Sequence, residues 1–135
     1  MRKIICLFSA VLIIGMMSCS KEDEFDVNLL VGQWECRYVA HKSIKSNSGE
    51  ILKDTVYQQF WNFKLYENMT GMNIGEDKPW DYSLNGNKIK LGGFEGKLEE
   101  LTPTAMSIVR TREYFNYDYE TQINEINTFV FAKIN

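Results

Sequence analysis

Few side chains in this sequence are of the types that perform catalysis. His41 is the only histidine, and it falls at the end of a predicted strand, before a lysine, where it is expected to be solvated. Cys36 would be a poor nucleophile if it were buried, because burial raises the pKa of a thiol. Glu99 and Glu100 are adjacent, so on a strand they point to opposite faces and cannot work as an acid–base pair. The sequence therefore predicts no enzymatic activity.

Two further patterns fall short of a binding motif. The run from Gly92 to Gly96 is glycine-rich, but no strand–loop–helix pattern surrounds it, which argues against a phosphate-binding loop. Four scattered acidic residues do not match an ordered calcium loop; they are Asp77, Asp81, Asp118 and Glu120. We therefore expect no metal ion and no cofactor.

The residue whose setting does indicate chemistry is Cys19. A short basic start precedes an almost unbroken apolar run from Ile4 to Met17, whose 14 residues are too few to span a bilayer. The segment Met16-Met17-Ser18-Cys19 resembles a bacterial lipobox. This resemblance implies that residues 1–18 are a lipoprotein signal peptide and that Cys19 is lipidated and anchors the chain to a membrane. An ordinary secretory signal cleaved nearby is the alternative.

Residues 19–28 are predicted to be a flexible acidic tether. Lys21-Glu22-Asp23-Glu24 follows directly after the cysteine, and such a stretch buries too little apolar area to fold. It resembles the surface-export signal of lipoproteins in one group of Gram-negative bacteria, which implies a location in the outer membrane facing outward at the cell surface. A plain solvated spacer is the alternative.

The mature chain would have 117 residues, which suits one domain with a modest core. Its 13 basic and 18 acidic side chains give a net charge of −5, which argues against binding to nucleic acid. Seventeen of the 18 aromatic residues lie in it, and aromatic residues favour strands. Cys36 has no obvious partner, and its place in an alternating strand favours a buried thiol over an intermolecular bridge.

Residues 29–135 are predicted to form a single all-β domain. In the first strand Trp34, Cys36, Tyr38 and Ala40 should share one face. Residues 42–54 are polar and predict a long loop, and residues 56–67 predict one strand. Asn85-Gly86-Asn87 indicates a tight hairpin turn, a segment near 106–115 another strand, and residues 116–120 a loop. About eight antiparallel strands with short connections favour an up-and-down barrel, with a two-sheet β-sandwich as the alternative.

Five segments, taken in order, resemble the lipocalin-like domain of small bacterial lipoproteins. They are Leu30-Val31-Gly32-Gln33-Trp34, Phe63 to Gly71, Trp80 to Leu91, Leu98 to Thr102, and Phe129 to Lys133. The resemblance covers nearly the whole mature chain. It implies an eight-stranded lipocalin-like barrel but no particular activity, because a fold does not carry a function with it.

Two functions follow from these expectations. In the first, the barrel binds a small apolar or amphipathic ligand without turnover, unless its own side chains fill it. The inward residues that would line the ligand site are Trp34, Tyr38, Trp61, Phe63, Trp80, Tyr82, Met106, Phe129 and Phe131. In the second, the domain is a surface-displayed module that contacts proteins or glycans through Tyr114, Phe115, Tyr117 and Tyr119.

Overall fold

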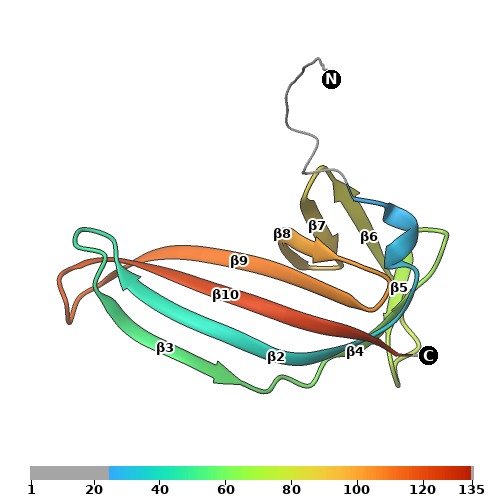
Figure 1. The fold of residues 1–135 in the computed structure, drawn as a ribbon, viewed down its shortest axis with the longest axis horizontal. Coiled ribbons are helices and arrows are strands. Elements are labelled where there is room, and N and C mark those ends of the chain that lie inside the picture. The colour runs from blue at the N-terminus through green and yellow to red at the C-terminus, as the bar shows by residue number, and fades with distance from the viewer. Residues whose placement is uncertain (1–24, 135) are drawn as a thin grey trace, which may run out of the picture.

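The computed structural model describes residues 25–134, which form one antiparallel sheet of nine strands (Figure 1). The strands are β2 (Gly32–Lys45), β3 (Ile51–Tyr57), β4 (Asn62–Leu65), β5 (Thr70–Asn73), β6 (Trp80–Asn85), β7 (Lys88–Leu91), β8 (Phe94–Leu101), β9 (Ala105–Asn116) and β10 (Thr121–Ile134). One 3-10 turn, η2 (Val27–Leu30), precedes them. In this part of the chain no helix is long and apolar enough to cross a membrane. The expected signal peptide, Cys19 and the tether up to Glu24 lie outside the described residues.

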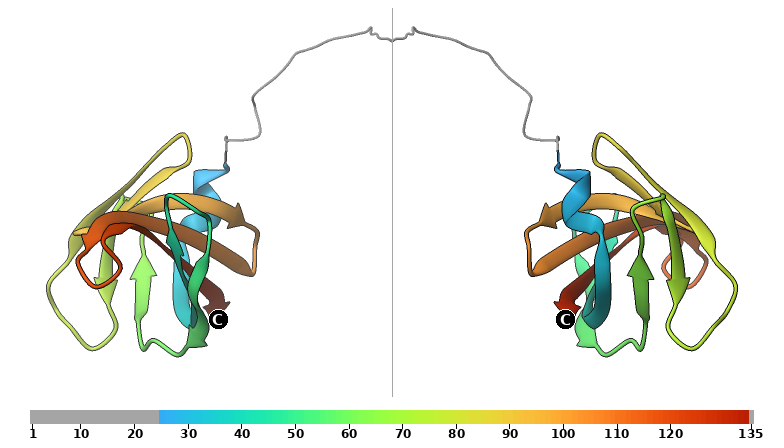
Figure 2. Two further views of the ribbon diagram at one scale, coloured as in Figure 1. Left: turned by 90° about the vertical axis from the view of Figure 1, so that its left-hand side faces the viewer. Right: turned by 90° about the vertical axis from the view of Figure 1, so that its right-hand side faces the viewer.

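Eight of the nine strands close into a ring. Each strand from β4 to β10 pairs with its neighbour in sequence, and β10 pairs back onto β2. β3 lies outside the ring, because the same edge of β2 pairs first with β4, over Gly32–Glu35, and then with β3, over Val39–Ile44. Views along the long axis show the sheet curling round on itself (Figure 2). The all-β, up-and-down, barrel-like architecture expected from the sequence is therefore confirmed. We call the eight-stranded ring the barrel.

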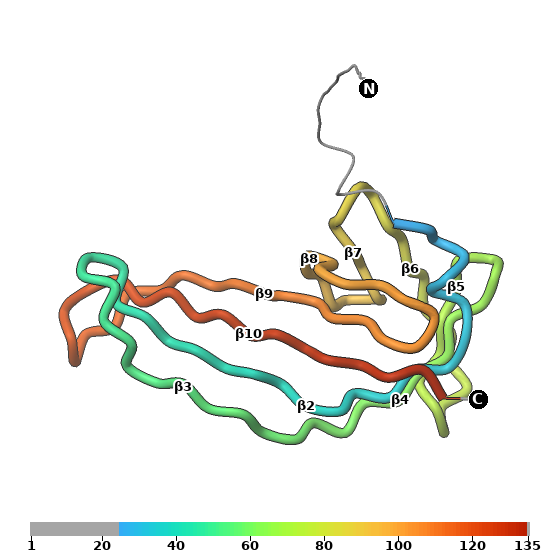
Figure 3. Tube along the Cα trace, viewed as in Figure 1, coloured from blue at the N-terminus to red at the C-terminus, as the bar shows by residue number. Residues whose placement is uncertain are grey.

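Three strands are much longer than the barrel requires. β2, β9 and β10 have 14, 12 and 14 residues, and they run beyond the barrel side by side with β3 (Figures 1 and 3). The result is a four-stranded extension with the order β3-β2-β10-β9. From Phe129 to Thr121, β10 covers about 25 Å of this extension at about 3.3 Å per residue. We call the free end of the extension the tip. The end of the barrel from which the extension leaves is called the mouth.

The core fills the interior of the barrel. Its fully buried members include Trp34, Phe63 and Phe131, together with aliphatic side chains from β4, β7, β8 and β9. The rings of Phe63 and Phe131 have centroids 5.5 Å apart and meet edge to face, which is a favoured arrangement. Cys36 is also buried, as expected, and burial raises the pKa of its thiol. An eight-stranded ring holds little more than its own side chains, and this one is packed accordingly.

The end opposite the mouth, the floor, is covered by η2, and a hollow of about 360 Å³ lies there between this turn and Tyr82. Asp26 caps this turn by accepting a hydrogen bond from the Asn28 backbone at 3.0 Å. Leu30 is fully buried, and Phe25 packs against the core. Val27 and Asn28, which the sequence analysis places in the tether, lie in this turn.

Two predicted element boundaries were wrong. Residues 42–54 are not a long loop, because β2 continues to Lys45 and β3 begins at Ile51. These strand segments are polar because they belong to the extension, where neither face of the sheet packs on the core. Residues 56–67 are not one strand: β3 ends at Tyr57, and β4 begins at Asn62. The interruption is where the chain moves from the extension to the barrel.

The predicted face of Tyr38 was also wrong, and so was that of Ala40, because Val39 between them points inward. Trp34 and Cys36 point inward as expected, but the β2–β10 register shifts between Val130 and Phe131, which pair with Tyr38 and Cys36. One extra residue in β2 makes this a β-bulge, so the next inward side chain is Val39. Tyr38 lies on the outside, 41% exposed.

Candidate ligand-binding site at the barrel mouth

The mouth is marked by a change from apolar to polar side chains along β2 and β10. Phe129 and Val39 are opposite each other in the last row of this ladder in which both side chains are buried. Two residues nearer the tip, Asn127 is opposite His41. The mouth therefore separates the packed core from a polar surface.

Aromatic rings surround the mouth. Trp61, just before β4, lies with its ring centroid 5.0 Å from that of Phe94, the first residue of β8. Phe94 in turn meets Phe129 edge to face at 5.0 Å. The indole nitrogen of Trp61 donates a hydrogen bond to Asn73 Oδ1 at 3.0 Å, which fixes the orientation of the ring.

A cavity of about 290 Å³ opens between these rings and the turn that joins β7 to β8. Its lining consists of Trp61, Asn73, Trp80, Leu91, Gly92, Gly93 and Phe94. Trp80 can lie flat against the sheet because Gly71 has no side chain; a Cβ there would lie 2.6 Å from the indole ring. We call this space the aromatic cavity.

A larger hollow of about 590 Å³ adjoins the aromatic cavity, and Gly93 lines both. It lies where β8 separates from β9, since the last pair between these strands is Lys97 with Val109. Beyond that point this edge of β9 has no neighbouring strand among the described residues. The lining of this groove consists of Asn87, Lys88, Gly93, Glu95, Gly96, Lys97, Val109, Arg110 and Thr111.

Arg110 links the groove to the aromatic mouth. Its guanidinium lies 4.8 Å from the centroid of the Phe94 ring, a cation–π contact. Gly96 permits this arrangement, because a Cβ there would lie 3.2 Å from Arg110 Cγ and 2.9 Å from the Val109 carbonyl oxygen. The absence of a side chain at Gly96 thus brings β9 close enough to place the arginine at the mouth.

One carboxylate of the groove is already neutralised. Glu95 accepts a hydrogen bond from the Lys88 ammonium at 2.8 Å. This bond lowers the pKa of Glu95 and raises the pKa of Lys88, so both remain charged at neutral pH. Because both side chains are exposed to solvent, this ion pair contributes little to the stability of the fold.

Toward the tip, the inner face of the extension carries a polar network. His41 Nδ1 lies 2.7 Å from Asn127 Oδ1, and His41 Nε2 lies 3.0 Å from Ser43 Oγ. Glu125 accepts from Arg112 at 3.1 Å and lies 3.9 Å from His41 Nε2. The Ser43–His41–Asn127 series has the spacing of a nucleophile, a base and an orienting group. Ser43, however, is only 8% exposed and lines none of the hollows at the mouth, so an acyl substrate has no access to it.

The structure brings together only some of the residues that the sequence predicts for a ligand site. Trp61 and Trp80 line the aromatic cavity, and Phe129 lies behind Phe94. The remaining inward residues fill the barrel; they are Trp34, Phe63, Tyr82, Met106 and Phe131. Tyr82 lies near the floor, where its hydroxyl donates to the Tyr66 carbonyl at 2.6 Å, and burial followed by the charge of Glu67 raises its pKa.

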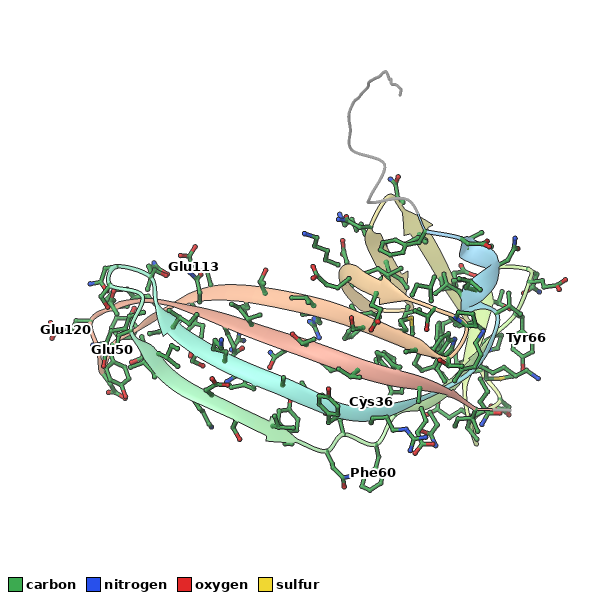
Figure 4. All side chains as sticks on the ribbon, in the orientation of Figure 1. Cys36, Glu50, Phe60, Tyr66, Glu113 and Glu120 are labelled. Atoms are coloured by element: carbon green, nitrogen blue, oxygen red, sulfur yellow. The ribbon has the colours of Figure 1, made fainter. Side chains whose placement is uncertain are left out.

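The four aromatic residues predicted for contacts with partners lie at the tip, in and beside the β9–β10 turn. Phe115 and Tyr117 meet edge to face with centroids 4.9 Å apart, and Tyr117 is 83% exposed. Tyr119 lies under the Lys45 ammonium at 5.2 Å. Tyr114 faces the other way, with the Arg112 guanidinium 4.9 Å from its ring. Figure 4 shows Glu50, Glu113 and Glu120 at this end of the molecule.

Sequence reasoning missed Phe94 and Arg110. The sequence signal for these two residues is the cluster of Gly92, Gly93 and Gly96, since glycine within strands marks places where another backbone approaches closely. In the structure Gly93 and Gly96 line the groove, Gly92 lines the aromatic cavity, and Gly96 allows β9 to come close to β8.

Within residues 25–134, no three side chains of the types that bind metals gather closely enough to hold an ion. Comparisons with family models, with curated proteins and with solved structures found no match for this chain.

Proposed function

We propose that the folded domain is a binding module that holds a small apolar or amphipathic molecule at the barrel mouth, without chemical turnover. The observation that supports this most directly is the aromatic cavity between Trp61, Trp80 and Phe94. Its volume of about 290 Å³ lies at the lower limit of about 300 Å³ for small-molecule sites, and the adjoining groove extends it. The ligand would lie across the mouth, since the core occupies the interior.

The lipocalin-like resemblance of the sequence is consistent with this proposal. Barrels of that kind present a ligand site at one open end, and here η2 covers the floor while aromatic rings line the cavity at the mouth. Aromatic walls supply a large apolar contact area at little entropic cost, and Asn73 offers a polar group beside them.

Fluorescence titration with N-phenylnaphthylamine, an uncharged apolar probe, tests the proposal. The probe should bind to the wild-type chain, and Trp61→Ala should weaken binding by about tenfold, which corresponds to about 1.4 kcal/mol for a lost aromatic contact. The matched control is Phe60→Ala, which removes the adjacent ring. Phe60 is 97% exposed and points away from the ribbon (Figure 4), so its loss should leave binding unchanged.

A second variant covers the case in which Trp61→Ala loosens the core. Gly93 has no atom within 4 Å of the position that a Cβ would occupy, and its φ is not positive. Gly93→Leu should therefore fold normally and block the junction of cavity and groove. No binding to the wild type, or equal binding by Gly93→Leu and the wild type, would contradict the proposal.

We also propose that the chain is an outer-membrane lipoprotein anchored through Cys19 and displayed at the cell surface, on the sequence features of residues 1–24. Protease added to intact cells should then digest the domain. Alanine in place of Glu22, Asp23 and Glu24 should protect it, whereas a mere spacer would give equal digestion of both proteins.

A second candidate function is contact with a protein or glycan through the tip. The specific observation in its favour is the exposed Phe115–Tyr117 pair, about 25 Å from the mouth along the extension. Tyr117→Ala combined with Phe115→Ser should abolish such a contact without changing probe binding at the mouth.

A further inference from the structure

The groove beside the aromatic cavity is basic in a chain that is acidic overall. Lys88, Lys97 and Arg110 line it together with a single carboxylate, Glu95, whereas the whole chain has a net charge of −3. A second hollow of about 250 Å³ continues along β9 and adds Arg112 together with its carboxylate partner, Glu125. Positive charge is thus concentrated at one side of the mouth.

The positions of two of these cations lower the stability of the fold. Lys88 and Lys97 are directly opposite each other in the β7–β8 ladder, and like charges in that position destabilise a sheet. Each has an acidic partner, Glu95 at 2.8 Å and Glu99 at 3.7 Å, but both pairs are exposed and contribute little. An anion bound between the lysines would offset the repulsion.

Arg110 is the groove cation with no carboxylate partner among residues 25–134. Arg112 nearby is paired with Glu125, and both lysines are paired, so Arg110 is the group with unused charge and unused N–H donors. Its guanidinium is held against Phe94 and lines both hollows. The unpaired edge of β9 at Arg110 and Thr111 offers backbone hydrogen bonds at the same place.

We infer that the mouth takes amphipathic anions: the apolar part of the ligand lies in the aromatic cavity, and its anionic head group binds in the groove at Arg110. This inference rests on the proposed function and adds the chemical class of the ligand. A carboxylate, sulfonate or phosphate head group would bind the Arg110 guanidinium, because each presents several acceptor oxygens to its N–H donors. The head group and the apolar part meet at Gly93, where no side chain separates the two spaces.

The test compares two probes that share an aromatic skeleton and differ in charge. Anilinonaphthalene sulfonate carries one negative charge, and N-phenylnaphthylamine carries none. Both are titrated into the purified full chain as wild type, Arg110→Gln, Arg110→Lys and Arg37→Gln. Arg37 is the matched control, because it is an exposed arginine at the β2 bulge, paired with Glu35 and outside the groove. Binding to other parts of the chain is common to all four proteins and cancels in the comparison.

Arg110→Gln should weaken binding of the sulfonate by about five- to tenfold while leaving the neutral probe unchanged, as expected for a lost charge-assisted hydrogen bond. Arg110→Lys should restore much of the affinity, and Arg37→Gln should change neither probe. Raising the salt concentration from about 0.05 to 0.5 M should weaken only the sulfonate, because the screening length shortens.

The two proposals fail in different ways. If both probes bind and Arg110→Gln affects them equally or not at all, the anion preference is wrong and the binding function stands. If neither probe binds to the wild type, the binding function is wrong and the inference falls with it. An unchanged thermal midpoint for Arg110→Gln ensures that a loss of binding reports on charge and not on folding.

Discussion

Trp34 connects the wall of the barrel to its floor. Its indole nitrogen donates a hydrogen bond to the Leu30 carbonyl at 2.8 Å, and the ring is fully buried. On its other side lies the Lys133 ammonium, 4.9 Å from the ring and bonded to the carbonyls of Leu29 and Val31. Burial lowers the pKa of Lys133. Residues from both ends of the domain therefore hold η2 in place.

The first prediction follows from this packing. Trp34→Ala should lower the free energy of unfolding by about 3–5 kcal/mol, since it leaves a large cavity and an unpaired carbonyl. Phe60→Ala removes an aromatic side chain that is exposed at the surface, and it should change the free energy of unfolding by less than about 0.5 kcal/mol. Guanidinium unfolding followed by circular dichroism measures both. Equal midpoints for the two variants would show that the floor contributes nothing to stability.

The thiol of Cys36 gives a second prediction. It is 6% exposed and its pKa is raised by burial, so little of the reactive thiolate forms at pH 8. In a chain with serine at positions 6 and 19, Ellman's reagent should react slowly with the native protein and at once after denaturation. A fast reaction with the native protein would mean that the β2 bulge opens readily.

The aromatic part of the candidate site could be predicted from the sequence, and its basic part could not. Trp61, Phe63 and Leu65 recur at every second position, as do Trp80, Tyr82 and Leu84, so the shared face of each set can be predicted from the sequence. The position of Arg110 depends on where β8 separates from β9 and on the close approach at Gly96. Both features are contacts between strands, and the spacing of residues within one strand does not predict them.

At the scale of elements, β3 differs from the other strands because one of its edges is unpaired along its whole length within the described structure. Such an edge can pair with another chain unless it is protected. Lys53 and Asp54, both exposed, interrupt an otherwise apolar and β-branched strand, Ile51–Tyr57. Charged residues at this position are a usual protection against aggregation.

The third prediction removes that protection. Lys53→Ile combined with Asp54→Val should produce concentration-dependent oligomers, detected by sedimentation velocity. The control is Lys64→Ile combined with Asp81→Val, which makes the same change in charge and hydrophobicity on strands that are paired on both sides. Oligomers in both proteins would show that surface hydrophobicity, and not the open edge, causes association.

The strands of the barrel were easier to predict than those of the extension. Trp80 to Leu91 alternates regularly around an Asn-Gly turn, and the structure has the expected hairpin there. In the extension few side chains are buried, among them Ser43 and Ile123, and these lie outside the core. The apolar alternation that marks a strand is therefore absent from residues 41–45 and 51–55. Their extended conformation comes from pairing with β10 and with each other, which only the tertiary structure reveals.

At the scale of the whole molecule, the shape separates three regions along one axis: the floor, the mouth and the tip (Figure 1). Phe25, the first described residue, packs at the barrel, so the chain leading to Cys19 attaches at the barrel and not at the tip. A lipid anchor at Cys19 would therefore leave the tip as the region most free to extend away from the membrane.

The fourth prediction concerns this anchor. Cys19→Ala should abolish incorporation of labelled fatty acid and release the protein from the membrane fraction, because the acyl chains contribute about 0.8 kcal/mol per buried methylene. Cys6→Ala is the matched control and should incorporate label normally. Label in the Cys19→Ala protein would refute the lipobox assignment.

The ring closes through one long ladder, β10 with β2, and this ladder continues into the extension. Amide hydrogens along the same two strands are therefore exposed to solvent by different structural openings. Near Phe131 an amide is released only when the core comes apart, whereas near Ile123 fraying of the tip suffices. Hydrogen exchange should be slow in the barrel half of β10 and progressively faster toward Thr121, with β3 the first strand to lose protection. The domain is thus expected to unfold in two stages, from the tip inward, with the mouth at the boundary between the labile and the stable part.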